Sequence, residues 1–216
     1  MLSRAFAAGV PARWVTADTV YGNDCSLQLW LQERRQAHVL SVSGQECVWI
    51  GFAQHRVKAL LAQVPDDAWH RLSAGDGAKG SRLYEWARLP LNCQYAPEWG
   101  RWLLVRRSLS EPSALSAYIA FAPADTPMAT LVQVAGTRWS IESCFEAAKG
   151  EVGLDEYGVR SWQGWHRHMS LCMLSHAFLT VLRATAGETA IKKGQSKPAT
   201  EGSLREFKQS RGLVSA

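Results

Sequence analysis

The sequence predicts an α/β fold interrupted by a mainly β insertion. Two short β-rich runs, residues 13–17 and 38–42, enclose a helical stretch at residues 25–36. This strand–helix–strand order is typical of an α/β layer. Three further strand signals follow, with proline and glycine breaks between them, at residues 82–89, 102–107 and 117–121. Helical patterns then run to residue 184.

Composition and strand signals divide the chain into four predicted segments. They are a core at residues 1–46, an inserted β-rich subdomain at 47–127, further core helices at 128–186, and a basic, disordered tail at 187–216.

The elements of the first segment each have a local cause. Residues 2–8 should form the end of a helix, because Gly9 and Pro11 stop helices at their C-terminal side. The run at 13–17 is too short to stand alone and should join a larger sheet. Asn23 or Asp24 can cap the helix that follows.

The inserted segment carries no recognisable nucleotide site. Residues 56–63 should form a helix closed by Pro65, and residues 73–81 a glycine-rich loop. This loop lacks the GK[ST] ending of a phosphate-binding loop. Some basic and aromatic residues of the insertion either face DNA or serve as strand ends and packed core, and both interpretations stay open. These residues are Lys79, Trp86, Trp102, Arg106 and Arg107.

Charge and cysteine content narrow the function classes. The net charge of +5 permits nucleic-acid binding, although charge must cluster to matter. The chain has no long uninterrupted apolar run and no convincing signal peptide, so we expect no membrane span and a cytoplasmic location. The five cysteines should be reduced thiols, and the lack of C-x-x-C pairs argues against structural zinc.

One predicted helix, residues 138–150, carries the most specific pattern. Helical spacing places four charged residues on one face: Arg138, Glu142, Glu146 and Lys149. A second face should be buried and carries Ile141, Phe145, Ala148 and Val152. Taken alone, Arg138 and Glu142 can be an ordinary exposed ion pair worth a few tenths of a kcal/mol.

The wider sequence context changes that interpretation. The string R-W-x-I-E, followed by Lys149, resembles the Y-x2-R-x3-E-x6-K signature of insertion-sequence transposases with an RNase H-like DDE catalytic domain. The similarity continues through G-L-D-E-Y-x-V-R-S-W-x-G-W-x-R-H at residues 153–168 and covers G-D-G-A-K-G and L-L-V-R-R-S-L. The resemblance implies a partial RNase H-like core in a bacterial, nucleoid-associated DNA transposase.

Asp18 is the second acidic candidate. A lone aspartate after a strand most often helps a turn or caps a helix. The phrase W-V-T-A-D-x-V-Y-G, however, resembles the family segment with the second catalytic aspartate. The two family segments also occur in the right order. We therefore predict that Asp18 and Glu142 are catalytic metal ligands, and that Arg138 and Lys149 contact DNA phosphates.

The resemblance also implies the chemistry. Three carboxylates of a DDE enzyme hold two Mg²⁺ or Mn²⁺ ions about 3.5–4 Å apart, which activate the nucleophile and stabilise the leaving oxygen. The partners would be transposon ends and target DNA, together with full-length transposase subunits.

The sequence departs from the family pattern in two ways. Ala135 stands where the signature has tyrosine, and no acidic residue precedes Asp18 to serve as the first catalytic aspartate. We therefore expect a truncated C-terminal part of a transposase that does not cleave DNA by itself. A regulatory DNA-binding module and a non-functional remnant are the alternatives.

The histidines close to the predicted helix at residues 162–184 are interpreted as packed or hydrogen-bonded rather than as metal ligands. They are His166, His168 and His176.

Overall fold

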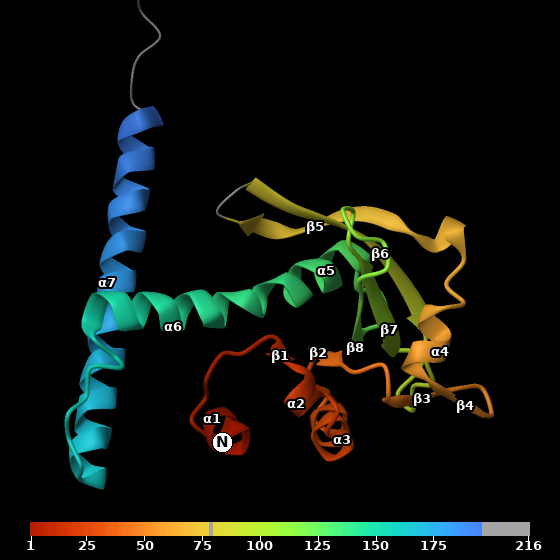
Figure 1. Ribbon diagram of the computed structural model, residues 1–216, viewed down its shortest axis with the longest axis horizontal. Coiled ribbons are helices and arrows are strands. Elements are labelled where there is room, and N and C mark those ends of the chain that lie inside the picture. The colour runs from red at the N-terminus through yellow and green to blue at the C-terminus, as the bar shows by residue number, and fades with distance from the viewer. Residues whose placement is uncertain (78–79, 196–216) are drawn as a thin grey trace, which may run out of the picture. The chain divides into compact units, whose positions relative to one another are not determined.

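The computed structural model describes residues 1–77 and 80–195 of a mixed α/β protein (Figure 1). The chain divides into two compact units, Met1–Glu142 and Ser143–Ala216. The first unit contains a mixed sheet, and the second contains C-terminal helices. The α/β class predicted from the sequence is confirmed at this level.

A six-stranded sheet forms the centre of the first unit. The outermost strand, β1, pairs in parallel with β2, and every other neighbouring pair is antiparallel. In spatial order the strands are β1 (Val15–Ala17), β2 (His38–Val42), β8 (Leu115–Pro123), β7 (Trp99–Arg107), β6 (Gly80–Pro90) and β5 (His70–Gly77).

The strands expected in the insertion continue the sheet of the core. β8 pairs with β2 along its length, with Leu40 opposite Ile119. The strand signals therefore located β6, β7 and β8 correctly, but they did not indicate that these strands share one sheet with β1 and β2. The boundary between the compact units, after Glu142, also falls inside the predicted helical segment.

Short helices connect β1 to β2. Asp24 caps α3 (Cys25–Glu33) by accepting bonds from the amides of Ser26 and Leu27, which confirms one of the two predicted caps. The preceding helix, α2 (Thr19–Gly22), approaches β2 closely, because a Cβ at Gly22 would lie 1.8 Å from the carbonyl oxygen of Ser41. The N-terminal helix α1 (Leu2–Ala7) begins the chain as predicted.

One face of the sheet packs against α5 (Met128–Thr137), which lies beside the strands in Figure 1. The cluster beneath α5 joins strand residues to Leu131, Val132, Val134 and Ala135 of the helix. The end of α5 approaches β5 so closely that a Cβ at Gly136 would lie 1.9 Å from the carbonyl oxygen of Ala74. Arg82 secures this contact by donating to the carbonyl oxygens of Ala74 at 2.9 Å and Gly136 at 3.2 Å.

A second cluster covers the other face of the sheet. It joins β7 and β8 to a small hairpin and a short helix, and includes Val48, Val57, Leu103 and Ile119. The covering elements are β3 (Cys47–Ile50), β4 (Ala53–Arg56), α4 (Val57–Leu61) and the 3₁₀ turn η1 (Asp66–Ala68). Both faces of the sheet therefore hold a buried apolar layer.

Three local expectations differ from the structure. Residues 73–77 continue β5 and residues 80–81 begin β6, so most of the expected loop is a strand hairpin. The alternation of Leu72 and Ala74 supports β5 despite the glycines, since both pack under α5. The helix expected at 56–63 is shorter because Arg56 still pairs with Cys47 in the β3–β4 hairpin. The third difference concerns the tail, where the last helix continues through Gln195, while residues 196–216 lie outside the described part.

The second unit consists of most of α6 (Trp139–Val152) and of α7 (Trp162–Gln195). Its small core contains Ala148, Leu154 and Cys172, with Val152 and Met169 packed against them. The apolar face predicted for α6 is buried only near its C-terminal end. Ile141 is 51% exposed and Phe145 is 46% exposed, because this core reaches only the last turns of α6.

Much of the apolar surface of α7 is also exposed. Its large exposed side chains include Trp162, Leu171, Leu174, Phe178, Val181 and Leu182. Within the described residues, the part of α7 from Trp162 to Ala186 is the one helical stretch long and apolar enough to cross a membrane. A helix that packs against protein passes the same test of length and composition, so this stretch does not decide where the protein resides.

Candidate functional site

Asp18 follows β1 and caps α2. Its Oδ1 atom accepts hydrogen bonds from the amides of Val20 at 3.1 Å and Tyr21 at 3.4 Å. The side chain is exposed, and both bonds end on the same oxygen. The capping role that the sequence left open is therefore present. In the described part of the chain, Oδ2 makes no hydrogen bond and stays available to a ligand.

Arg138 and Glu142 form the ion pair that their spacing predicts. Nη1 of Arg138 donates to Oε1 of Glu142 at 2.8 Å, and the Arg138 guanidinium also lies over the ring of Trp139. The Glu142 side chain is 46% exposed, so the pair adds only a few tenths of a kcal/mol to stability. Oε2 of Glu142 makes no bond to a described residue, which gives Glu142 one available oxygen, like Asp18.

Asp18 lies past the carboxyl end of β1. It follows β1 directly, at the level of Ser41 in β2, and Ser41 pairs with Tyr118 in β8. Burial raises the pKa of Tyr118, and the positive charges of Arg106 and Arg138 act in the opposite direction. Arg138 follows α5, whose last turn meets β5 at Gly136 and Ala74, at the other edge of the sheet from β1.

Trp14 and Thr16 lie on the α5 side of the sheet. Trp14 packs against the cluster beneath α5, and side chains two positions apart in an extended chain point the same way. Asp18 lies past the end of β1 and directs Oδ1 at the first amides of α2. Tyr118 belongs to that cluster as well. No hydrogen bond or ion pair joins Asp18 to Glu142 within the described residues.

The remaining charges of α6 are exposed. Glu146 and Lys149 form no ion pair with a described residue. Lys149 lies seven positions after Glu142, about two turns along the same helix, so the two side chains share a helical face. Lys149 is thus free to meet an external anion.

Divalent metal binding finds incomplete support. Carboxylate oxygens suit Mg²⁺ and Mn²⁺. Over residues 1–77 and 80–195, however, no group of three or more His, Cys, Asp or Glu side chains is arranged to hold a metal ion. Asp18 and Glu142 offer one available oxygen each, which falls short of a full coordination set.

The basic and aromatic residues of the insertion mostly serve the sheet. Trp86 is 1% exposed and Trp102 is 9% exposed, so both tryptophans are packed. Arg107 pairs with Glu85 at 2.7 Å, and Arg106 donates to Ser116 and lies over Tyr84. These contacts favour the structural interpretation, while Lys79 lies outside the described residues.

Two of the three histidines of α7, His168 and His176, are hydrogen-bonded as predicted, while His166 is exposed. Nε2 of His168 lies 3.0 Å from the carbonyl oxygen of Gly153, and Nε2 of His176 lies 3.4 Å from the thiol of Cys144. His166 stacks edge-on against Trp162 and Trp165.

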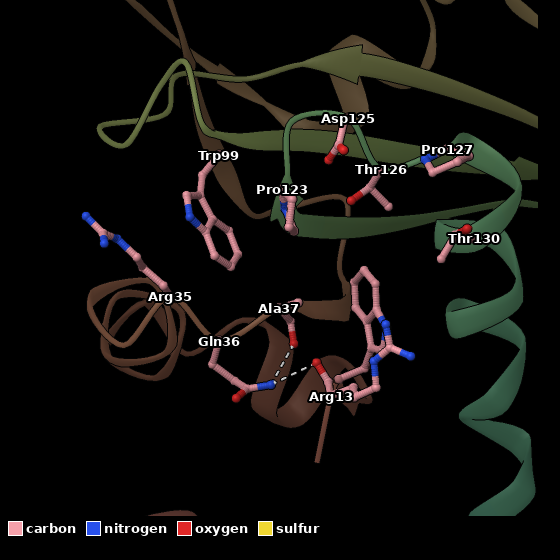
Figure 2. A pocket seen from close by; sticks show the side chains of 11 residues that line it. Arg13, Arg35, Gln36, Ala37, Trp99, Pro123, Asp125, Thr126, Pro127 and Thr130 are labelled. Carbon is pink, nitrogen blue, oxygen red and sulfur yellow. Dashed lines mark hydrogen bonds between the residues drawn. The ribbon is translucent and has the colours of Figure 1, made fainter. Parts of the chain in front are cut away.

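The sequence did not indicate a pocket of about 480 Å³ at the opposite end of the sheet, where β1 and β2 begin (Figure 2). In Figure 2, Arg35 and Trp99 lie on one side of it, and Arg13 and Thr130 on the other. Gln36 holds the chain that leads into β1 by donating to the carbonyl oxygens of Ala12 and Arg13. Arg13 and Arg35 both lie outside helices and strands, in connecting segments whose conformation a single sequence predicts poorly.

The chain matches no protein-family model and no curated protein.

Proposed function

We propose that the chain carries the DNA-phosphate site and two metal ligands of a DDE-type transposase with an RNase H-like core. One observation supports this proposal most strongly. Asp18 accepts its cap bonds through Oδ1 alone and Glu142 pairs with Arg138 through Oε1 alone, so within the described residues each acid keeps one oxygen free for a ligand. Parallel strands with helical connections commonly carry their sites at the carboxyl ends of the strands, which is where Asp18 lies.

Each residue has a role in this proposal. Asp18 and Glu142 would hold Mg²⁺ or Mn²⁺ through the carboxylate oxygens that their cap and ion-pair bonds leave free. These ions, when bound, supply activation of a hydroxyl nucleophile and stabilisation of the leaving oxygen. Arg138 pairs with Glu142 through Nη1 alone and offers its other N–H donors to a phosphate. Lys149 adds a point charge about two helical turns along α6.

The isolated chain should bind DNA without cutting it. Two single-oxygen ligands hold a divalent ion weakly, because Mg²⁺ demands near-ideal octahedral geometry and usually keeps several waters. The phosphate contacts of Arg138 and Lys149 do not depend on a complete metal site. The chain would therefore serve as a DNA-binding or regulatory partner of full-length transposase subunits.

Metal binding is tested with Mn²⁺ and NMR spectroscopy of the whole chain, because bound Mn²⁺ broadens the signals of nearby nuclei. We expect broadening near both Asp18 and Glu142 at millimolar Mn²⁺, and its loss in Asp18→Asn and Glu142→Gln. Asn still caps a helix, and Gln still accepts a bond from Arg138. Asp24→Asn is the matched control, since Asp24 caps α3 through the same pattern of bonds. Broadening at only one of the two acids would contradict a shared site.

DNA binding is tested with a duplex that carries a transposon end and with an unrelated duplex, over a series of salt concentrations. Arg138→Gln and Lys149→Gln should weaken binding and reduce its salt dependence by about one unit of slope each. Arg71→Gln, an exposed arginine on β5, is the control. Efficient Mn²⁺-dependent nicking that disappears in Glu142→Ala would refute the expectation that the chain alone is inactive.

A further inference from the structure

A second pocket lies on the face of the sheet opposite α5. Its volume is about 460 Å³, and it opens between α3, the β3–β4 hairpin and β7. Polar side chains and one aromatic ring line it, among them Gln28, Gln32, Glu46, Trp49, Gln54 and Arg101. Its lining includes none of Asp18, Arg138 and Glu142. Alternation along β7 places Arg101 on the side of Leu103 and Val105, which belong to the cluster away from α5.

Arg101 is the unusual member of this pocket. Its Nη2 atom donates to Oε1 of Gln28 at 3.0 Å, while its Nε atom is buried without a hydrogen-bond partner. No carboxylate of a described residue lies within 4.0 Å of its guanidinium. Burial lowers the pKa of Arg101, and Glu46 acts on it only at longer range.

The side chains around Arg101 are held in defined positions by burial and hydrogen bonds. Gln28 is 3% exposed and Gln32 is 5% exposed, although both belong to a helix that has a solvent-facing side. Gln28 is held in place because its Nε2 atom donates to the carbonyl oxygen of Gly22 at 2.8 Å. Its amide oxygen is thereby aimed at Arg101. A charge that is partly removed from water normally has a counter-charge or several hydrogen bonds, and half-buried Arg101 has one neutral hydrogen-bond partner among the described residues.

We propose that this pocket binds a small molecule through one carboxylate or phosphate group, with Arg101 as its counter-charge. The two terminal nitrogens of the guanidinium, of which Nη2 is also bonded to Gln28, offer the paired donors that an oxyanion accepts. The amides of Gln32 and Gln54 add neutral donors, and the ring of Trp49, which is 48% exposed, forms a flat wall for the rest of the molecule.

Glu46 makes the pocket selective for low charge. Its Oε1 atom accepts a bond from the thiol of Cys25 at 3.5 Å, and burial together with Glu46 raises the pKa of that thiol, which keeps it protonated. A ligand with two negative charges on one group is repelled by the Glu46 carboxylate. The pocket should therefore prefer a carboxylate or a singly charged phosphate.

The test uses the whole chain, with inorganic phosphate and acetate titrated separately at constant ionic strength against chloride. NMR signals of the Arg101 Nε–H group, the Gln28 amide and the Trp49 indole report binding locally. One of the two anions should give saturable shifts at all three groups in the natural protein. Tighter binding of acetate identifies a carboxylate ligand, and tighter binding of phosphate at pH 6 identifies a phosphate ligand.

Three variants separate this proposal from general anion binding by a basic protein. Arg101→Met should weaken binding at Gln28 and Trp49 roughly tenfold or more, because a charged hydrogen-bond partner is lost. Arg71→Met, at an exposed arginine of β5, should change nothing. Glu46→Gln should strengthen binding several-fold by removing the repulsion.

Two results would overturn the proposal. The first is the absence of saturable shifts at Arg101 with either anion, a measurement that needs no variant and so does not depend on whether Arg101→Met folds. The second is a Glu46→Gln variant that is destabilised and binds no better, because Glu46 would then be the internal counter-charge of Arg101. Neither result bears on Asp18 and Glu142, whose metal and DNA tests stand apart.

Discussion

The apolar side chains of the sheet in the first unit are largely buried, whereas those of the helices in the second unit are largely exposed. Both faces of the sheet are covered, one by α5 and the other by α4 and the β3–β4 hairpin, and Phe121 is completely buried. In α7, Phe178 is 62% exposed. The same residue type thus stabilises one unit and contributes almost nothing to the described packing of the other. Apolar periodicity in the sequence thus predicts which face of a helix is apolar, but only a neighbouring element or chain decides whether that face is buried.

Substitution of the two phenylalanines gives the largest expected difference. Phe121 stacks on Trp99 at 4.7 Å and on His38 at 5.4 Å, so Phe121→Ala should destabilise the sheet by about 3–5 kcal/mol through lost contacts and a new cavity. Phe178→Ala should change stability by no more than about 0.5 kcal/mol. Hydrogen exchange of each unit measures both effects. A large loss of protection in α7 on Phe178→Ala would show that its exposed face is in fact packed.

A buried histidine should make the sheet sensitive to acid. Burial lowers the pKa of His38 from 6.5 to about 4, and its Nε2 atom has no partner among the described residues. Between pH 6.5 and about pH 4, His38 is therefore protonated in the unfolded chain and neutral in the folded sheet. Stability is fully present above pH 6.5 and falls as pH drops toward 4, by about 3 kcal/mol at most.

Urea unfolding of the sheet at several pH values tests this expectation. His38→Gln has no titrating group and should remove this part of the pH dependence, so its stability should change less between pH 6.5 and pH 4. Equal slopes in the variant and the natural protein would assign the acid sensitivity to other residues.

Two helical glycines give the smallest expected effects, with opposite signs. Gly136→Ala should destabilise the α5–β5 contact by about 2 kcal/mol, because the new Cβ would meet the carbonyl oxygen of Ala74 at 1.9 Å. Gly150→Ala should stabilise α6 by about 0.5–1 kcal/mol, since nothing lies within 4 Å of its Cβ position and alanine favours a helix. Thermal unfolding and hydrogen exchange measure both changes. Destabilisation by Gly150→Ala would indicate a close neighbour for α6 that the described residues lack.

Much of the fold was predictable because its signals are local. The cap at Asp24, the strands around residues 82–121 and the helices after residue 126 depend on short stretches of sequence. The pairing of β8 with β2 was not predictable, because strand partners far apart in sequence leave no local pattern. The hairpin at residues 70–90 was obscured by its glycines.

Of the candidate site, only the ion pair between Arg138 and Glu142 was predictable from the sequence. The spacing of Arg138 and Glu142 on one helix gave their ion pair directly. The position of Asp18 relative to them depends on sheet order, and its cap bonds to Val20 and Tyr21 on a turn whose geometry the sequence left open. The pocket around Arg101 gave no signal in the sequence, because a half-buried arginine in a strand cannot be told from an exposed one until its neighbours are known.

Arg82 ties the hairpin of β5 and β6 to the segment that follows α5. Its guanidinium donates to the carbonyl oxygens of both Ala74 and Gly136, and Arg138 lies only two residues after Gly136. A force or a partner that bends this hairpin therefore pulls on the backbone just ahead of the Arg138–Glu142 pair. The β5–β6 hairpin is thus joined to the segment that carries Glu142 both through Arg82 and through the close approach of Gly136 to Ala74.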